Sequence, residues 1–215
     1  MYVVVMASPK GGVGKSALGR NLLVLAVQAG HQVVAVDLDP QATTKTWVGR
    51  RDKVRVSAPQ ILPIPVVTGD LSNWRAALRK AEATGADFAV IDTPPSIEAD
   101  LPAVLGLVKH AHLVLVPTQP SQDDLDSVGP WMRQLRAEKV KGVFVLNRAN
   151  RRTKSFGVMR AKLLNMGPLC PVEVPQLEEI MLAAGNGLGV MDMTKANSAD
   201  TFSALWGYVM QEMPL

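Results

Sequence analysis

The chain of 215 residues has a single cysteine, Cys170, and no long apolar run. One cysteine excludes an internal disulfide and any multi-cysteine metal or iron–sulfur site built by one chain, so we expect Cys170 to be a small packed side chain. No apolar run approaches the roughly 18 residues of a membrane span. Residues 1–6 lack the basic lead and the length of a signal peptide. We therefore expect a soluble, cytoplasmic protein.

Aromatic residues are scarce at 5% and charged residues make up only 20%, but apolar residues reach 47%, which argues against disorder. The length suits a single domain over residues 1–215. Six short apolar runs that do not alternate with polar residues predict strands buried on both faces, as in a parallel sheet. They occupy residues 2–6, 32–37, 62–67, 87–92, 112–117 and 142–147.

Stretches with helical periodicity separate these runs. Apolar residues recur at helical spacing from Leu71 to Ala81, and Gly85 follows as a stop signal. Ser121 resembles a helix N-cap, although Gly129-Pro130 must bend or interrupt the helix that follows. Residues 50–60 show the least pattern and are expected to form a loop. The alternation predicts a doubly wound α/β fold with a mostly parallel sheet and helices on both faces.

The clearest functional signal is ASPKGGVGKSALGRNL at residues 7–22, directly after the first predicted strand. A glycine-rich turn between strand and helix frees backbone N–H groups to bind phosphates, and the helix dipole adds to their pull. Lys15 would reach the β- and γ-phosphates, and the Ser16 hydroxyl would bind Mg²⁺. Mg²⁺ and a nucleotide that carries β- and γ-phosphates are thus the predicted ligands, and the predicted loop contacts are Gly11, Gly12, Val13, Gly14, Lys15, Ser16 and Ala17. The alternative is a glycine-rich turn that binds nothing.

The motif KGGVGKS resembles the deviant Walker A motif of the ParA/MinD family of P-loop ATPases, whose signature lysine stands at the position of Lys10. VDLDPQAT at 36–43 is similar to the family's switch I, and FAVIDTPPS at 88–96 to its Walker B strand running into switch II. LVPTQPSQDDL at 115–125 and VFVLNR at 143–148 also resemble family segments. The resemblance covers nearly the whole chain, and within the family it points to the short, ParF-like partition ATPases.

The resemblance implies roles for individual residues. Lys10 would contact the phosphates of the nucleotide bound by the other subunit in an ATP-sandwich dimer, in the manner of an arginine finger. Asp39 would orient or activate the attacking water. Asp37 and Asp92 would support the Mg²⁺ shell. The alternatives are a lysine that serves only its own loop and ordinary acids at strand ends.

The expected adenine site contains Asn147, at the position of an adenine-contacting asparagine in the family, and Pro175. The segment VEVPQLEEI at 172–180 departs from the family because it lacks the arginine often found there. Ala17 stands where the family usually has threonine, so a hydroxyl contact to the α-phosphate is lost. Weaker or less selective nucleotide binding would follow.

The segment from Lys139 to Val172 contains eight basic residues and no acidic one, although the whole chain carries a net charge of only +4. Such asymmetry is typical of binding to a phosphate backbone. No helix-turn-helix or zinc pattern suggests base reading, so we expect nonspecific duplex DNA. The alternative is a solvated basic face. The predicted DNA contacts are Arg148, Arg151, Arg152 and Lys154.

The last segment carries apolar residues at helical spacing: Phe202, Leu205, Trp206, Val209 and Met213. A membrane-binding amphipathic helix would need a polar face rich in lysine and arginine, and no basic residue follows Lys195. We therefore expect this helix to pack on the sheet and expect no membrane partner.

The function these patterns favour is a ParA-type ATPase that dimerises on ATP and binds the nucleoid. It would position DNA or another cargo and release it when a ParB-like adaptor protein stimulates hydrolysis. The rival hypotheses are a membrane-associated regulator of the MinD kind and a metabolic P-loop ligase or synthetase. The identity of the cargo stays open.

Overall fold

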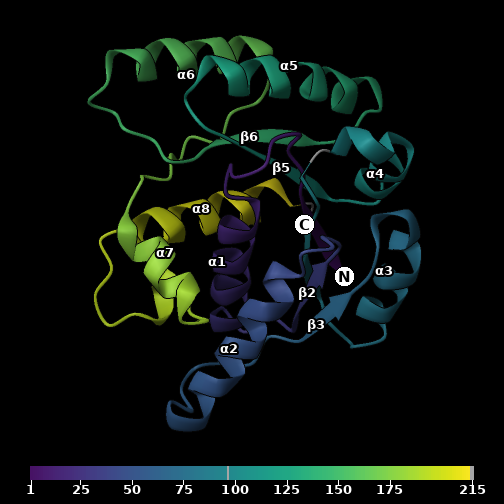
Figure 1. Ribbon diagram of the computed structural model, residues 1–215, viewed down its shortest axis with the longest axis vertical. Coiled ribbons are helices and arrows are strands. Elements are labelled where there is room, and N and C mark those ends of the chain that lie inside the picture. Colours follow the sequence, from purple (N-terminus) through teal and green to yellow (C-terminus); the bar gives the residue numbers. More distant parts are fainter. Residues whose placement is uncertain (96, 214–215) are drawn as a thin grey trace.

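The predicted apolar runs form one six-stranded sheet in the computed structural model, which describes residues 1–95 and 97–213 (Figure 1). All neighbouring strands are parallel, in the order β3-β2-β4-β1-β5-β6. The strands are β1 (Tyr2–Met6), β2 (Val33–Asp37), β3 (Val66–Thr68), β4 (Phe88–Asp92), β5 (Leu113–Thr118) and β6 (Gly142–Leu146). The predicted parallel sheet is confirmed.

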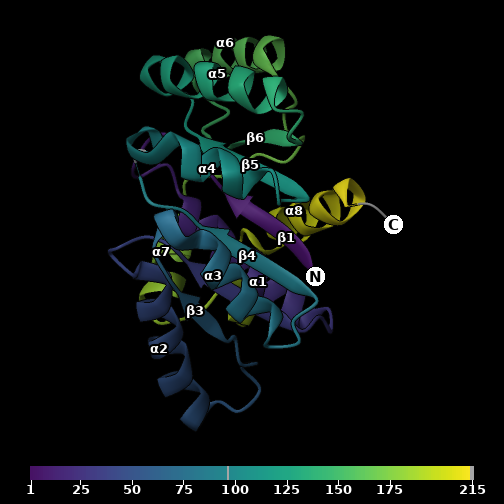
Figure 2. The ribbon, with the colours of Figure 1, turned by 90° about the vertical axis from the view of Figure 1, so that its right-hand side faces the viewer.

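Helices cover both faces of the sheet (Figures 1 and 2). One apolar cluster joins the sheet to α3, α4 and α5, and a second joins its other face to α1 and α8. The α-helices are α1 (Lys15–Gln28), α2 (Thr43–Ser57), α3 (Trp74–Glu82), α4 (Leu101–Val108), α5 (Gln122–Ala137), α6 (Lys154–Met166), α7 (Glu178–Gly185) and α8 (Ala199–Glu212). Short 3₁₀ turns are η1 (Leu71–Asn73), η2 (Ile97–Asp100) and η3 (Val190–Asp192). The doubly wound fold is therefore confirmed.

The strands read as continuous apolar runs because both faces of the sheet are covered. Every residue of β2, β4, β5 and β6 is buried. Since all strands are parallel, their carboxyl ends meet at one edge, where ligands of open α/β sheets bind. Asp37 and Asp92 are register partners at that edge, as the last residues of β2 and β4.

Several predicted helix features are confirmed. The apolar residues predicted from Leu71 to Ala81 are buried in η1 and α3, and Gly85 has the positive φ of 78° that favours glycine after a helix. The hydroxyl of Ser121 accepts a hydrogen bond from the backbone N–H of Asp124 at the start of α5. The interruption considered at Gly129-Pro130 does not occur, because that helix is continuous through Pro130. The carbonyl that Pro130 leaves without a donor belongs to the exposed Asp126, where water can replace the lost bond.

The loop expected at 50–60 is wrong over residues 50–57, which form the second half of α2, whereas residues 58–60 lie outside helices and strands as predicted. Trp47 and Val48 are buried on this helix, and so is Arg51, which a sequence pattern counts as polar. The Arg51 guanidinium donates to the carbonyl of Leu62 at 2.8 Å, and its other acceptors, Gly187 and Asp192, lie far along the chain. The strand expected at 62–67 is shorter and begins at Val66, after two prolines that cannot donate to a sheet.

The C-terminal helix α8 packs on the sheet as predicted, with Phe202, Leu205 and Val209 fully buried. Cys170 is also fully buried, and burial raises the pKa of its thiol to about 11. Within the described residues, no helix combines the length and apolar character that a membrane crossing requires. Ser96, the last residue of the stretch likened to switch II, lies outside the described residues.

Candidate nucleotide site

The glycine-rich loop connects β1 to α1 at the carboxyl edge of the sheet. Gly14 ends the loop with a φ of 98°, and a Cβ atom there would lie 2.0 Å from the amide nitrogen of Asn147. Both its backbone conformation and this close approach require glycine. The amide nitrogen of Asn147 donates to the carbonyl of Val13 at 2.7 Å, which ties the loop to the end of β6. Gly11 and Gly12 are exposed on the same loop.

Lys15 begins α1 and points back into the loop. Its ammonium group donates to the carbonyl oxygens of Ser8 at 3.2 Å and Lys10 at 3.0 Å. Burial lowers the pKa of Lys15, while the nearby carboxylates of Asp92 and Asp39 oppose that change. A desolvated cation at the start of a helix is well placed to attract an anionic phosphate.

Lys10 has a different environment from Lys15. Its side chain is 36% exposed, and its ammonium group lies 3.2 Å from the carboxylate of Asp124 in the first turn of α5. The Asp124 side chain is only 7% exposed and also accepts a hydrogen bond from the backbone N–H of Gln119 at 2.7 Å. In this conformation the second loop lysine is therefore held by an acid of its own chain.

Asp92 lies beside the start of α2. One of its carboxylate oxygens accepts a hydrogen bond from the Thr44 hydroxyl at 2.9 Å, and the other is buried with no hydrogen-bond partner among the described residues. Burial raises the pKa of Asp92, and the hydroxyl groups of Ser16 and Thr44 oppose the rise. A buried oxygen without a donor is suited to a water molecule of a hydrated Mg²⁺.

Asp37 is engaged with the start of α2. One oxygen accepts hydrogen bonds from the backbone N–H groups of Thr44 and Lys45, both at 2.9 Å. The other oxygen accepts a hydrogen bond from the backbone N–H group of Asp39 at 3.2 Å. This carboxylate satisfies free N–H groups of the first helical turn, which normally need a capping side chain. Asp37 therefore links the end of β2 to α2 directly. The Asp39 carboxylate accepts a hydrogen bond from the backbone N–H of Gln41 at 2.9 Å.

A cleft of about 360 Å³ brings most of the predicted phosphate and metal residues together. Its lining includes Lys15, Ser16 and Asp39, together with Gly11, Gly12, Gly14 and Ala17. In the described part of the chain, no three His, Cys, Asp or Glu side chains are grouped so as to hold a metal alone. The donors present fit an ion that takes most of its ligands from a nucleotide and water: a hydroxyl on Ser16 and two carboxylates behind it.

A second cavity of about 200 Å³ adjoins the cleft and shares Gly14, Ala17 and Arg148 with it. Asn147 and Pro175 both line it, so the two residues predicted for the adenine site lie together. The remaining lining is largely apolar: Leu18, Val174, Leu177, Ile180, Met181 and Phe202. A largely apolar cavity that also contains the amides of Asn147 and Gln176, beside a phosphate loop, has the chemistry to hold a flat base.

The sequence analysis did not assign a role at the site to three residues of this region: Arg20, Thr44 and Asp124. Arg20 lines the cleft from α1 and donates to the hydroxyl of Thr44 at 3.2 Å. Asp124 holds Lys10. The helical spacing from Ser16 to Arg20 was a usable signal, because residues four apart share a face of a helix. No pattern in the sequence marks the contacts of Thr44 and Asp124, which join distant segments.

The structure divides the predicted DNA-binding residues. Arg148 lines the nucleotide cleft, whereas Arg151 and Arg152 line a separate cavity of about 340 Å³ with Glu173. Glu173 forms ion pairs with Arg151 at 2.5 Å and with Arg160 at 2.8 Å. Arg152 and Lys154 are exposed. The basic stretch therefore receives part of its neutralisation from an acid that directly follows it.

Comparisons with known proteins show which proteins this chain is similar to. The chain is 32% identical over 129 residues to Maintenance of carboxysome distribution protein A of Gloeobacter kilaueensis, covering 57% of this chain and 51% of that protein. It is 30% identical over 153 residues to the chromosome-partitioning ATPase Soj of Thermus thermophilus, covering 61% and 60% of the two chains. The chain thus spans between half and two thirds of the length of these relatives.

Solved structures share the fold. The cell division protein MinD of Aquifex aeolicus superposes with a TM-score of 0.79 at 17% identity over 100% of both chains. MinD of Pyrococcus horikoshii, solved with Mg-ADP, has a TM-score of 0.74 at 19% identity, covering 97% of this chain and 95% of that one. The model of the CobQ/CobB/MinD/ParA nucleotide-binding domain matches residues 4–190. With this match over most of its length, the chain belongs to the CobQ/CobB/MinD/ParA family of nucleotide-binding proteins.

Proposed function

We propose that this chain is a ParA-type ATPase that binds ATP and Mg²⁺ and closes into an ATP-sandwich homodimer. The observation that carries the proposal is the contrast between the two loop lysines. Lys15 is buried and directed into its own loop, whereas Lys10 is partly exposed and held by a single ion pair. A partly exposed lysine at the edge of the loop can leave Asp124 for a phosphate bound by a second copy.

The nucleotide would occupy the two adjoining cavities. The base would lie between Asn147 and Pro175, and the phosphates would lie along the loop. There they would accept hydrogen bonds from backbone N–H groups and contact the ammonium group of Lys15. The Ser16 hydroxyl would bind Mg²⁺, and Asp92 and Asp37 would support the ion through water. Ala17 would provide no hydroxyl contact to the α-phosphate.

Hydrolysis requires a water molecule to attack the γ-phosphorus while the bond from that phosphorus to the bridging oxygen of ADP breaks. The products are ADP, inorganic phosphate and a proton. Asp39 would orient that water, and its place in the lining of the cleft with Lys15 and Ser16 supports this role. The charge that develops on the transferred group would be stabilised by Lys15 in cis and Lys10 in trans.

The dimer would bind nonspecific duplex DNA through the basic stretch and release it when an adaptor protein of the ParB kind stimulates hydrolysis. The relatives named for carboxysome distribution and chromosome partitioning support a role in positioning a cargo. The packing of α8 against the sheet supports DNA over membrane as the binding surface. The ATP-bound protein would then associate with the nucleoid in the cytoplasm.

The decisive experiment compares Lys10→Ala with Lys109→Ala, an exposed lysine whose ion pair with Glu138 lies in another part of the chain. Static light scattering with ATP and Mg²⁺ should show a doubled mass for the wild type and for Lys109→Ala. Lys10→Ala should bind ATP and stay monomeric. A Lys10→Ala protein that dimerises fully on ATP would show that Lys10 works within its own chain.

The role of Asp39 has its own test. Asp39→Ala should bind ATP and dimerise, but its hydrolysis should fall by about 100-fold or more, as for the loss of a general base or water-orienting group. Phosphate release measured with and without DNA would follow this loss. Normal turnover by Asp39→Ala would assign the role elsewhere, with Asp37 the next candidate.

A further inference from the structure

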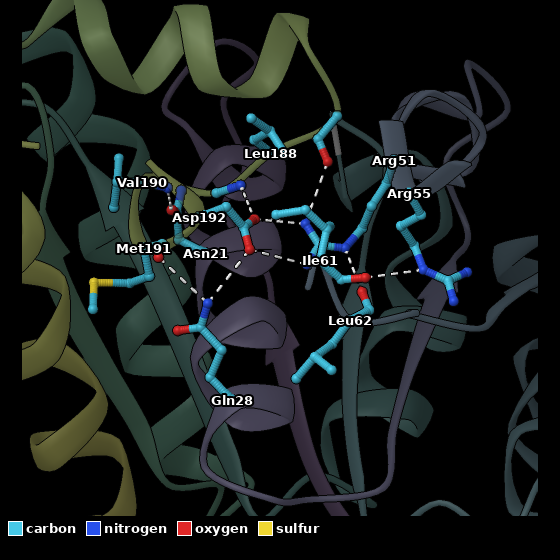
Figure 3. Close-up of polar contacts among 12 residues, drawn as sticks. Asn21, Gln28, Arg51, Arg55, Ile61, Leu62, Leu188, Val190, Met191 and Asp192 are labelled. Carbon is cyan, nitrogen blue, oxygen red and sulfur yellow. Dashed lines mark hydrogen bonds and ion pairs between the residues drawn. The ribbon is translucent and has the colours of Figure 1, made fainter. Parts of the chain in front are cut away.

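The segment at residues 187–192 lies directly against α2, although the two are separated by over a hundred residues in sequence (Figure 3). The Arg51 guanidinium forms two hydrogen bonds with the carboxylate of Asp192, at 2.6 and 3.2 Å. The two side chains are 0% and 2% exposed. A bidentate pair of this kind fixes both the distance and the orientation of the two segments.

Further contacts join the same two segments. The Arg51 guanidinium also donates to the carbonyl of Gly187 at 3.4 Å, and the Trp47 indole donates to the carbonyl of Leu188 at 3.2 Å. Gly187 has a φ of 75°, and a Cβ atom there would lie 2.3 Å from the backbone nitrogen of Arg51. The backbone of the segment therefore touches the backbone of α2, and only glycine permits that approach.

The acceptor side of the pair is equally constrained. The Asp192 carboxylate accepts hydrogen bonds from the backbone N–H of Gly189 at 2.8 Å and from the Gln28 amide at 3.4 Å (Figure 3). Burying two ions costs several kcal/mol of desolvation each, and replacement by apolar residues often leaves stability unchanged or improved. Net stability is thus a poor reason for this pair, whereas a fixed geometry between two segments is a good one.

The two joined segments lead to opposite ends of the candidate nucleotide site. The first turn of α2 is bound to Asp37, and its Thr44 hydroxyl donates to Asp92, both at the phosphate and metal end. The segment at 187–192 follows α7, whose Ile180 and Met181 line the apolar cavity at the base end. Helix α2 connects the contacts of Thr44 with Asp37 and Asp92 to the Arg51–Asp192 pair.

We propose that Arg51 and Asp192 are positioning residues that couple the base cavity to the switch I segment at residues 38–45. Occupation of the base cavity would fix α7 and the 187–192 segment, and the ion pair would carry that restraint along α2 to Asp39. The carboxylate that orients water would then be held in place only when a base is bound with the phosphates. This inference rests on the proposed ATPase function, because it assigns the base and the phosphates to those two cavities.

One other route joins the same elements. The Asn21 side chain on α1 accepts a hydrogen bond from the backbone N–H of Val190 at 2.8 Å, and α1 continues directly from the glycine-rich loop. The same helix also reaches switch I, because Arg20 donates to the Thr44 hydroxyl at 3.2 Å. Asn21→Ala cuts this second route at the 187–192 segment and so separates it from the Arg51–Asp192 pair.

The test uses adenosine, which has a base and no phosphates, and measures backbone hydrogen exchange at residues 38–45. In the wild type, saturating adenosine should slow exchange there by about tenfold, within the usual 5- to 150-fold range of coupling between two sites. In Arg51→Met/Asp192→Asn the slowing should fall below about twofold, while exchange at residues 177–185 still responds to adenosine. The paired change removes both charges, so no ion is left buried alone.

Two matched controls should keep the response. Arg55→Met/Asp52→Asn removes an ion pair one turn further along the same helix, at 3.2 Å, which does not reach the 187–192 segment. Asn21→Ala removes the second route. A full response in Arg51→Met/Asp192→Asn, or its loss in both controls, would overturn the proposal.

Gly187→Ala provides a variant that leaves every charge in place. The added methyl group should force α2 away from the 187–192 segment and weaken the response at 38–45 by severalfold, as the double variant does. An unchanged response in Gly187→Ala would also count against the coupling. If the wild-type protein binds neither Mg-ATP nor adenosine, the proposed function is wrong. If it binds both ligands and exchange at residues 38–45 does not change, only the coupling is wrong.

Discussion

The phosphate loop and the basic stretch at 139–172 differ in how exposed their charged side chains are and in how those side chains are paired. At the loop, each lysine has specific neighbours: the buried Lys15 has the carbonyls of Ser8 and Lys10, and the partly exposed Lys10 has the carboxylate of Asp124. In the basic stretch most charges are exposed, and two of them share the single acid Glu173. One region is organised before a ligand arrives, whereas the other offers charge that solvent and salt can screen.

Because of this difference, we expect a substitution of a charged residue to have a larger effect at the phosphate loop than in the basic stretch. A buried charge that loses its partner stays desolvated, which costs several kcal/mol. An exposed charge loses about 1 kcal/mol or less when its ion pair is broken. Predictions at the loop should therefore be large and specific, and predictions in the basic stretch small and dependent on salt.

The largest effect is expected for Lys15→Ala. The variant removes the buried ammonium that would face the nucleotide phosphates, so ATP affinity should fall by more than about 100-fold. Titration with a fluorescent ATP analogue measures this loss, with Lys10→Ala as the control that should keep monomeric binding. Near-normal affinity in Lys15→Ala would mean that phosphates do not bind at this loop.

Gly14→Ala should have the next largest effect, because the added Cβ atom meets both a positive φ and the Asn147 amide. We expect a loss of about 3 kcal/mol in the free energy of unfolding, from backbone strain plus overpacking. Gly30→Ala separates the two causes, since Gly30 has a φ of 92° and open space around it. That control should lose only about 1 kcal/mol in urea unfolding. Equal losses in both variants would show that contact with Asn147 has no cost.

The fold was predictable because its signals are local in sequence. Six apolar runs and the periodic helices between them require no knowledge of distant contacts. The error at residues 50–57 has the opposite cause, since the buried Arg51 depends on acceptors from other segments, among them the carboxylate of Asp192. A sequence pattern counts arginine as exposed, and nothing near Arg51 in the sequence announces that acid.

The candidate site divides along the same line. The loop from Gly11 to Ser16 could be predicted because its residues are consecutive and their chemistry depends on spacing. Lys10 follows β1, whereas Asp124 lies in α5. No regular spacing in the sequence links two such distant residues, so their ion pair could not be predicted. For the basic stretch, counting charges overlooked Glu173, one residue beyond the chosen boundary, which binds two of the arginines.

Cys170 offers a smaller effect inside the basic stretch itself, at a buried position. Burial raises the pKa of its thiol from 9.0 to about 11, so the folded protein holds this proton more tightly than the unfolded chain. The stabilisation is complete below pH 9 and is lost as pH rises from 9 to 11. Two pH units correspond to about 2 to 3 kcal/mol by linkage. In urea unfolding, the free energy of unfolding of Cys170→Ala should fall less between pH 9 and pH 11 than that of the wild type, by this amount. An identical fall in both proteins would mean that other groups cause it.

The smallest expected effect tests whether the basic stretch binds DNA at all. Glu173→Gln keeps a hydrogen-bond acceptor but removes the charge that Arg151 and Arg160 now share. If these arginines meet phosphates, the variant with ATP should bind duplex DNA about threefold more tightly, independent of sequence. The slope of log affinity against log salt should steepen by about 0.9 for each added phosphate contact. Gel-shift titrations over a salt series measure both quantities.

Two matched changes sharpen that last prediction. Glu138→Gln frees Lys109, a cation outside the stretch, and should leave DNA affinity unchanged. Arg152→Ala removes an exposed arginine and should flatten the slope by about 0.9, whereas Arg151→Ala should flatten it less because Glu173 already engages that side chain. If Glu173→Gln and Glu138→Gln give the same affinity and the same slope, the stretch is a solvated basic face. The contrast with the phosphate loop would then be one between a binding site and ordinary surface.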